Sequence, residues 1–122
     1  MKILIIEDEV ELLESIASYL KNEDFICEKA STFFEAEDKL ASFNYDIILL
    51  DITLPDGNGI DLLKLINKKS KLLPVIMISG HATVQIAVEA IRLGAYEFIE
   101  KPFSKEKILN YVDRALESAL LK

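Results

Sequence analysis

Charged and hydroxyl side chains stand at the ends of four short, mainly apolar segments of the chain. In chain order they are Glu7 and Asp8, Asp51, Ser79 and Lys101. If the fold gathers them, three carboxylates about 5 Å apart repel one another by roughly 3 kcal/mol per pair at an effective dielectric constant of about 20. Mg²⁺ would offset this repulsion, because it binds few protein oxygens and keeps several waters. With Lys101 as a second cation and Ser79 as a donor, the set predicts a pocket that receives a phosphoryl group on Asp51.

Strand-like runs alternate with segments of helical period along the chain. The expected strands are Ile3–Ile6, Phe25–Ala30, Asp46–Leu50, Val75–Ile78 and Tyr96–Glu100. Thr32 with Glu35 predicts the start of the second helix, and Ser104 predicts the start of the fifth. Gly94 is expected just past the end of the fourth helix.

Each expected helix carries apolar residues at a spacing that packs one face on a sheet. The positions expected to face the core are Leu12, Leu13, Ile16 and Leu20 in the first helix, Phe33, Ala36, Leu40 and Phe43 in the second, Ile60, Leu63 and Ile66 in the third, Val84, Ala87, Val88 and Ile91 in the fourth, and Ile108, Leu109, Val112, Leu116 and Leu120 in the fifth.

Five strands interleaved with five helices predict an α/β fold with a parallel sheet, because each crossover between parallel strands needs a helix. Three of the runs are unbroken and apolar, as expected of central strands, whereas Phe25–Ala30 and Tyr96–Glu100 contain charges and are expected at the edges. Right-handed crossovers then favour a doubly wound, flavodoxin-like (βα)5 arrangement with strand order 2-1-3-4-5. Ligands bind such sheets at the carboxyl ends of the strands, where the chemical residues stand.

The composition indicates one compact, soluble domain spanning residues 1–122. The chain is 51% hydrophobic and has a net charge of −7, from 14 Lys and Arg against 21 Asp and Glu. The acidic excess argues against direct binding to nucleic acid. The N-terminus resembles neither a signal peptide nor a membrane span, and the single cysteine, Cys27, cannot form an internal disulfide. We therefore expect a cytoplasmic protein with no membrane association.

The ordered set Glu7-Asp8, Asp51 within LLDITLPDGNG, Ser79 within VIMISGHA, and Lys101-Pro102-Phe103 resembles the receiver domain of two-component response regulators. The resemblance covers essentially the whole chain. It implies that Asp51 accepts a phosphoryl group from a sensor histidine kinase or a small phosphodonor. It also implies that Asp8, Asp51 and the Thr53 carbonyl bind Mg²⁺, with Glu7 acting mainly through water.

The same resemblance implies a conformational switch. Ser79 would bond to the phosphoryl group and Phe98 would turn inward, where the family often has Thr and Tyr. Thr53 and His81 would border the phosphoryl group and set the lifetime of the phosphorylated state. It also implies a cis peptide bond before Pro102, which would direct Lys101 into the site.

A regulated interface is a further expectation. Ile86, Ala90 and Leu93 widen the apolar arc of the fourth helix beyond one core contact, although ordinary packing would also account for Leu93. The receiver family commonly dimerises through this helix, the strand Tyr96–Glu100 and the fifth helix. We therefore expect a regulated interface on this surface, where a homodimer could form. These residues do not identify the output domain or partner, which we expect to act in transcription.

Other interpretations remain open at this stage. Glu7 and Asp8 could simply begin a helix, and Lys101 could be an ordinary surface lysine. One rival is a binding module of the same fold that is never phosphorylated. Another is a phosphohydrolase with an aspartyl nucleophile, although Thr53 stands where such enzymes usually place a second Asp. Either a stand-alone or an excised receiver domain would fit the chain.

Overall fold

The computed structural model describes residues 1–81 and 83–121. Over these ranges the main sheet has five parallel strands in the order β2-β1-β3-β6-β7, which confirms the predicted doubly wound order. The strands are β1 (Lys2–Ile6), β2 (Ile26–Ala30), β3 (Ile47–Asp51), β6 (Val75–Ser79) and β7 (Glu97–Glu100). Asp51 and Ser79 are thus the last residues of their strands. From the sequence, each of them is expected just after the end of its strand.

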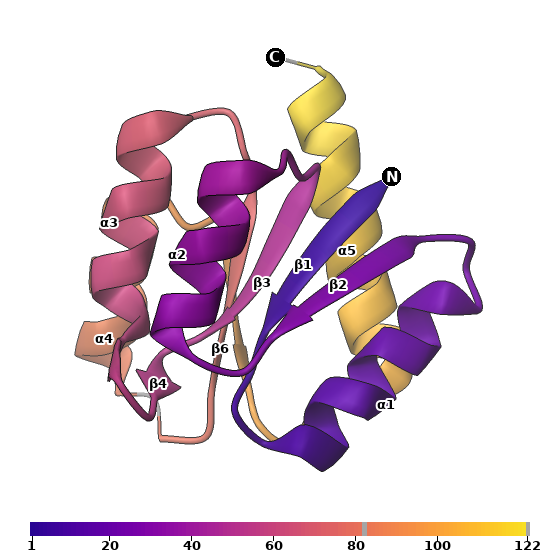
Figure 1. Cartoon of the computed structure of the whole chain (residues 1–122), viewed down its shortest axis with the longest axis horizontal. Helices are drawn as coiled ribbons and strands as arrows, with labels where there is room; N and C mark the ends of the chain where they lie inside the picture. Colours follow the sequence, from indigo (N-terminus) through magenta and orange to yellow (C-terminus); the bar gives the residue numbers. More distant parts are fainter. Residues whose placement is uncertain (82, 122) are drawn as a thin grey trace.

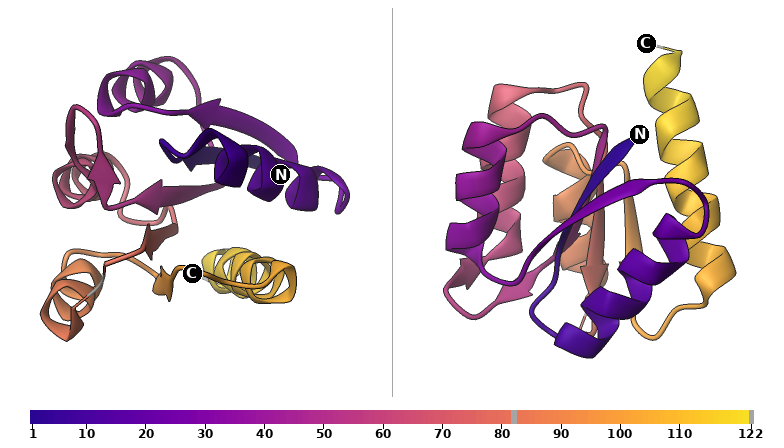
Figure 2. Two further views of the ribbon diagram at one scale, coloured as in Figure 1. Left: turned by 90° about the horizontal axis from the view of Figure 1, so that it is seen from below. Right: turned by 45° about the vertical axis from the view of Figure 1, so that its right-hand side comes forward.

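Helices cover both faces of the sheet. Among the described residues they are α1 (Val10–Lys21), α2 (Phe33–Ser42), α3 (Gly59–Lys69), α4 (Val84–Arg92) and α5 (Lys105–Leu120). Figure 1 shows α2 and α3 side by side on one face, with α1 and α5 on the other, and Figure 2 shows the same two layers from other directions. α4 lies on the same face as α2 and α3.

The core consists of two apolar layers separated by the sheet. Leu4 and Ile6 of β1 belong to the layer under α2, α3 and α4, whereas Ile3 and Ile5 belong to the layer under α1 and α5. Successive side chains of a strand point to opposite faces, so a central strand must be apolar at every position. β3 and β6 are accordingly buried along their whole length.

The predicted helix ends are confirmed. Thr32 Oγ1 accepts a hydrogen bond from the Glu35 backbone N–H at 3.0 Å, and Ser104 caps α5 in the same way. Gly94 follows α4 with φ +109°, a left-handed conformation that glycine adopts without strain.

The predicted inward face of α4 is wrong. Ala90 is fully buried, whereas Val84, Val88 and Ile91 are 81%, 44% and 46% exposed. Ile86 and Ala90, which were expected to widen the apolar arc toward an interface, instead pack on the core together with Leu93. Both apolar stripes repeat at helical spacing, so periodicity alone does not distinguish them. The stripe with the small Ala90 at its centre is the one that approaches the sheet closely.

Two other residues predicted to face inward are exposed. Phe43 is the C-cap of α2 rather than part of its helical face, and its ring lies under Lys2 Nζ, 4.8 Å from the ring centroid. Leu120 is 74% exposed because the end of α5 extends past the sheet, as Figure 1 shows.

A two-stranded hairpin was not predicted. β4 (Thr53–Leu54) pairs antiparallel with β5 (Gly57–Asn58), and Pro55 and Asp56 form the turn. The run Pro55, Asp56 and Gly57 is typical of a turn and by itself indicates no strand. The hairpin leads directly from the end of β3 to the start of α3, so it borders the carboxyl edge of the sheet.

Candidate phosphoacceptor site

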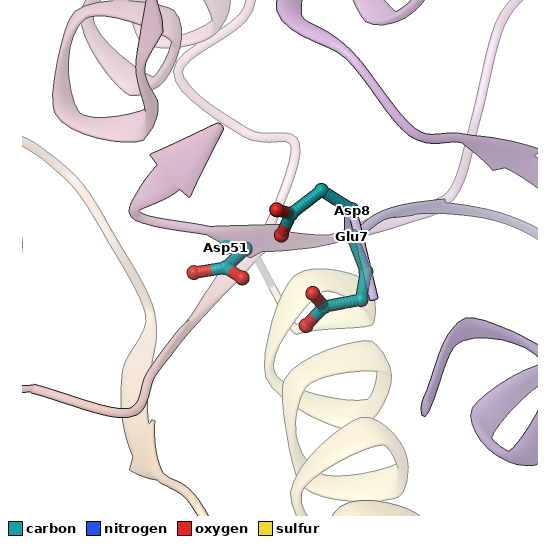
Figure 3. Close-up of side chains that lie close together, drawn as sticks. All are labelled: Glu7, Asp8 and Asp51. Carbon is teal, nitrogen blue, oxygen red and sulfur yellow. The ribbon is translucent and has the colours of Figure 1, made fainter. Parts of the chain in front are cut away.

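Three carboxylates meet at the carboxyl edge of the sheet. β1 leads into Glu7 and Asp8, and its parallel neighbour β3 ends at Asp51. One carboxylate oxygen of each residue lies within 4.8 Å of the others, and Figure 3 shows the three side chains converging. The structure therefore brings together the acids that the sequence predicted for one pocket.

Backbone amides orient two of these carboxylates. Asp51 Oδ1 accepts a hydrogen bond from the Thr53 N–H at 3.1 Å, and Glu7 Oε2 accepts one from the Glu9 N–H at 3.0 Å. Glu7 and Asp51 are only 0% and 3% exposed, whereas Asp8 is exposed. The site is thus a cluster of two buried carboxylates and one solvent-exposed carboxylate, Asp8.

Lys101 supplies the positive charge of the pocket. Its Nζ lies 2.9 Å from Glu7 Oε1, 3.1 Å from Asp51 Oδ2 and 3.2 Å from Glu9 Oε1. Its side chain is 14% exposed, and the peptide bond to Pro102 is cis, as the resemblance implied. Lys101 is therefore a nearly buried partner of the acids and not an ordinary surface lysine.

Burial and charge perturb the pocket's titration. Burial raises the pKa of Glu7 to about 7, although the hydrogen bond from the Glu9 amide and the nearby Lys101 oppose the shift. Burial alone would lower the pKa of Lys101, but its contacts with Glu7 and Asp51 outweigh this and raise it. Lys101 is consequently protonated at neutral pH.

Ser79 lies across the same edge. It is 4% exposed at the end of β6, and its Oγ accepts a hydrogen bond from the His81 N–H at 3.1 Å. The Ser79 carbonyl accepts the Lys101 N–H at 2.8 Å, which ties the end of β6 to the start of the Lys101 loop. The His81 side chain is exposed.

The donor set fits a hard divalent cation. Glu7 Oε1 is buried and accepts no hydrogen bond of regular geometry, and its partner is the Lys101 ammonium 2.9 Å away. Lys101 is one positive charge shared among three carboxylates, so a further cation would offset the negative charge that remains. Oxygen donors at this spacing, open to solvent on one side, suit Mg²⁺ with several of its waters retained.

Phe98 lies outside the pocket itself. It is half-buried on β7 and packs against the apolar layer under α2, α3 and α4, with Met77 of β6 as its neighbour in the sheet. Of the predicted site residues, it is the one that the structure places in the core layer.

Sequence reasoning missed Glu9. Its carboxylate is the third acidic contact of Lys101, and its amide orients Glu7. The signal was present in the run of three acids, Glu7, Asp8 and Glu9, but only the first two follow the strand closely enough to have been singled out.

A separate apolar groove of about 790 Å³ lies between α2 and α3, lined in part by Phe34, Leu62 and Leu65. It contains none of the predicted site residues. The predicted chemistry therefore belongs to the carboxylate cluster and not to this groove.

The matching family model is that of the response regulator receiver domain, and it matches residues 3–113. The chain belongs to this family. It is 40% identical over 122 residues to the putative response regulator NtrX-like of Rickettsia bellii, covering 98% of this chain and 26% of that protein. It is 32% identical over 108 residues to the transcriptional regulatory protein BasR of Escherichia coli K12, covering 88% of this chain and 49% of that protein.

A similar solved structure is the beryllofluoride-activated NtrC4 receiver domain dimer. It has a TM-score of 0.92 and 38% identity, with 97% of this chain and 98% of that chain covered. The chain spans about a quarter of the length of the NtrX-like relative. Among the described residues, no helix combines the length and hydropathy needed to cross a membrane.

Proposed function

We propose that residues 1–122 act as one receiver domain in which Asp51 accepts a phosphoryl group from the phosphohistidine of a sensor histidine kinase. An Asp51 carboxylate oxygen would attack phosphorus, the bond from phosphorus to the histidine nitrogen would break, and an aspartyl phosphate would form. The observation that carries this proposal is the nearly buried Asp51, held within reach of two other acids and a lysine. Gathering these acids is unfavourable for folding on its own, because it concentrates negative charge.

The residues around Asp51 have distinct proposed roles. Asp8, Asp51 and the Thr53 carbonyl would hold Mg²⁺, and Glu7 would act through bound water. When bound, the ion would neutralise charge on the transferring phosphoryl group. Lys101 would bind a phosphoryl oxygen, because its Nζ already contacts Asp51.

Ser79 and Phe98 would couple the phosphoryl group to a surface. The Ser79 hydroxyl would donate a hydrogen bond to a phosphoryl oxygen, drawing in the loop that follows β6. Phe98 would then move further into the core layer that it already contacts. Thr53 and His81, which lie two residues past Asp51 and Ser79 respectively, would limit access of water to the phosphoryl group.

The responding surface would be α4, β7 and α5. Val84, Val88 and Ile91 form an exposed apolar stripe on α4, which favours a dimer or an output partner there. The name of the NtrC4 structure describes an activated dimer, and the BasR relative is named as a transcriptional regulator. We propose transcriptional control as the output and the cytoplasm as the compartment.

Phosphorylation by a small phosphodonor tests this function directly. The chain is incubated with acetyl phosphate and Mg²⁺, and its intact mass is measured. We expect one added phosphoryl group, lost in Asp51→Asn and retained in the matched control Asp46→Asn, whose acid lies at the opposite end of the sheet and accepts the Lys2 N–H. An unchanged parent mass would favour a module that is never phosphorylated. Turnover of unrelated phosphate esters would favour a phosphohydrolase.

A further inference from the structure

The turn of the β4–β5 hairpin is attached to a helix that is distant in sequence. Asp56 Oδ1 accepts the Phe33 N–H at 2.6 Å, and Asp56 Oδ2 accepts the Phe34 N–H at 3.0 Å. These are the first two amides of α2, which have no partner within the helix. Asp56 therefore caps a helix to which it does not belong.

The cap at the start of α2 is divided between two sources. Thr32 accepts the Glu35 N–H, so the first three amides of the helix are all satisfied, one by a local residue and two by Asp56. Hydrogen bonds from the Phe34 and Phe33 amides lower the pKa of Asp56, so its charge is retained at neutral pH beside the positive end of the helix dipole.

Packing reinforces this attachment. The Cα of Gly57 approaches the ring of Phe33 so closely that a Cβ at this position would lie 2.7 Å from Phe33 Cδ2. The hairpin is therefore in contact with α2 through both a charged residue and a close van der Waals surface.

The other end of the hairpin lies at the phosphoacceptor. Thr53 begins β4, pairs with Asn58 across the hairpin, and donates its N–H to Asp51 Oδ1. Only Leu54 and Pro55 separate Thr53 from Asp56. A restraint on Asp56 is thus transmitted through a very short, paired segment to the residue that orients Asp51.

We propose that Asp56 is a positioning residue for the cation site. By attaching the hairpin to α2, it holds Thr53 in place at Asp51. The Thr53 carbonyl, the hairpin's proposed ligand, is then in position before the ion binds. This inference rests on the proposed function, because it requires that the carboxylate pocket bind Mg²⁺.

Coupling between two sites is reciprocal, so the ion must also tighten the cap. In the unaltered chain, Mg²⁺ should slow hydrogen exchange at the Phe33 and Phe34 amides, which donate hydrogen bonds to the Asp56 carboxylate. The exchange rate of the Glu35 amide, which donates its hydrogen bond to Thr32 Oγ1, should be nearly unchanged.

The test compares two caps of the same helix. Mg²⁺ is titrated into the parent, Asp56→Ala and Thr32→Ala, and the dissociation constant is read from the amide resonances of residues 7, 8 and 51. We expect Asp56→Ala to weaken binding about 3- to 10-fold, because lost supporting contacts typically reduce metal affinity. Thr32→Ala loosens the same helix without touching the hairpin and should change affinity less than about twofold. Asp56→Asn, which keeps one accepting oxygen, should fall between the parent and Asp56→Ala.

Each outcome separates the two proposals. If the parent shows no saturable response to Mg²⁺, the proposed function and this inference both fail. If the parent binds the ion but Asp56→Ala and Thr32→Ala have equal effects or none, only the positioning role fails. Should Asp56→Ala not fold, the exchange experiment on the parent decides, and equal protection of all three amides, or none, overturns the role.

Discussion

Lys101 Nζ lies 3.1 Å from Asp51 Oδ2, although 50 residues separate the two along the chain. The contact arises because β3 and β7 flank β6 in a parallel sheet, so their carboxyl ends lie at the same edge. The lysine therefore already contacts the carboxylate that we propose as the phosphoacceptor.

Replacing Lys101 with Gln should slow phosphorylation of Asp51 by acetyl phosphate about 100-fold, because a positioned donor to the transition-state charge is lost. The rate is measured by intact mass over time at saturating Mg²⁺. Lys105→Gln is the matched control, since Lys105 lies on α5 with its Nζ 6.0 Å from the Tyr19 ring centroid. Equal rates in the parent and Lys101→Gln would contradict the proposed role.

Glu7 should lower the stability of the metal-free protein at neutral pH. Its pKa is raised from 4.5 to about 7 by burial, so the folded state holds a proton that the unfolded state has released between these values. The free energy of unfolding therefore falls as pH rises through this window and levels off above it. In EDTA, Glu7→Gln should be more stable than the parent by on the order of 1 kcal/mol above pH 7, with no difference below pH 4.5.

Urea denaturation at a series of pH values measures this difference. Added Mg²⁺ should narrow it, because the ion stabilises the folded parent. Glu14→Gln is a suitable control, because Glu14 is an exposed carboxylate paired with Lys29 far from the pocket. If the parent is more stable than Glu7→Gln in EDTA at pH 8, the buried Glu7 carboxylate does not destabilise the folded state, and the prediction is wrong.

His81 should influence the lifetime of the phosphorylated state without being needed to form it. Its backbone N–H donates to Ser79 Oγ, which His81→Ala preserves, so the substitution changes the side chain alone. We expect dephosphorylation to become about 3- to 10-fold faster, because water gains access to the phosphoryl group. Loss of the added mass is followed after removal of phosphodonor, with Gln85→Ala on α4 as the control. An unchanged dephosphorylation rate would show that the His81 side chain does not control the lifetime of the phosphorylated state.

Much of the fold and the site followed from the sequence because both depend on strand ends. An unbroken apolar run identifies a central strand, and the residue at its end must lie at the sheet's carboxyl edge. This places Glu7, Asp51 and Ser79 near one another without knowledge of any side-chain rotamer. The capping residues Thr32 and Ser104 were equally local signals.

The missed features depend on contacts that no local pattern encodes. The strands of the β4–β5 hairpin have two residues each, too few for alternation to be visible. Asp56, between Pro55 and Gly57, is typical of a turn residue, and no local pattern indicates its partners in α2, which lie 23 and 22 positions earlier. On α4 the helical period predicted the helix, but the inward face chosen from it was wrong, because two apolar stripes repeat at the same spacing.

The corrected face of α4 can be checked by stability. Ala90 is fully buried, so Ala90→Leu should overpack the contact with the sheet and lower the free energy of unfolding by about 1–3 kcal/mol. Val88→Leu, on the exposed stripe, should change it by less than about 0.5 kcal/mol. Urea denaturation measures both variants, and a reversed order would restore the face expected from the sequence.

The exposed stripe should instead control association. Val84, Val88 and Ile91 recur at positions i, i+4 and i+7, which places them on one side of α4, pointing away from the core. Burying a charge in an apolar contact is unfavourable, so Val88→Glu should prevent a dimer that forms through this stripe while leaving the fold intact. Sedimentation equilibrium with Mg²⁺ and beryllofluoride, a phosphoryl mimic, should show the parent as a dimer and Val88→Glu as a monomer. Gln85→Glu adds the same charge to a polar position of the helix and should still dimerise. A parent that stays monomeric, or a Val88→Glu variant that dimerises, would place the regulated interface elsewhere.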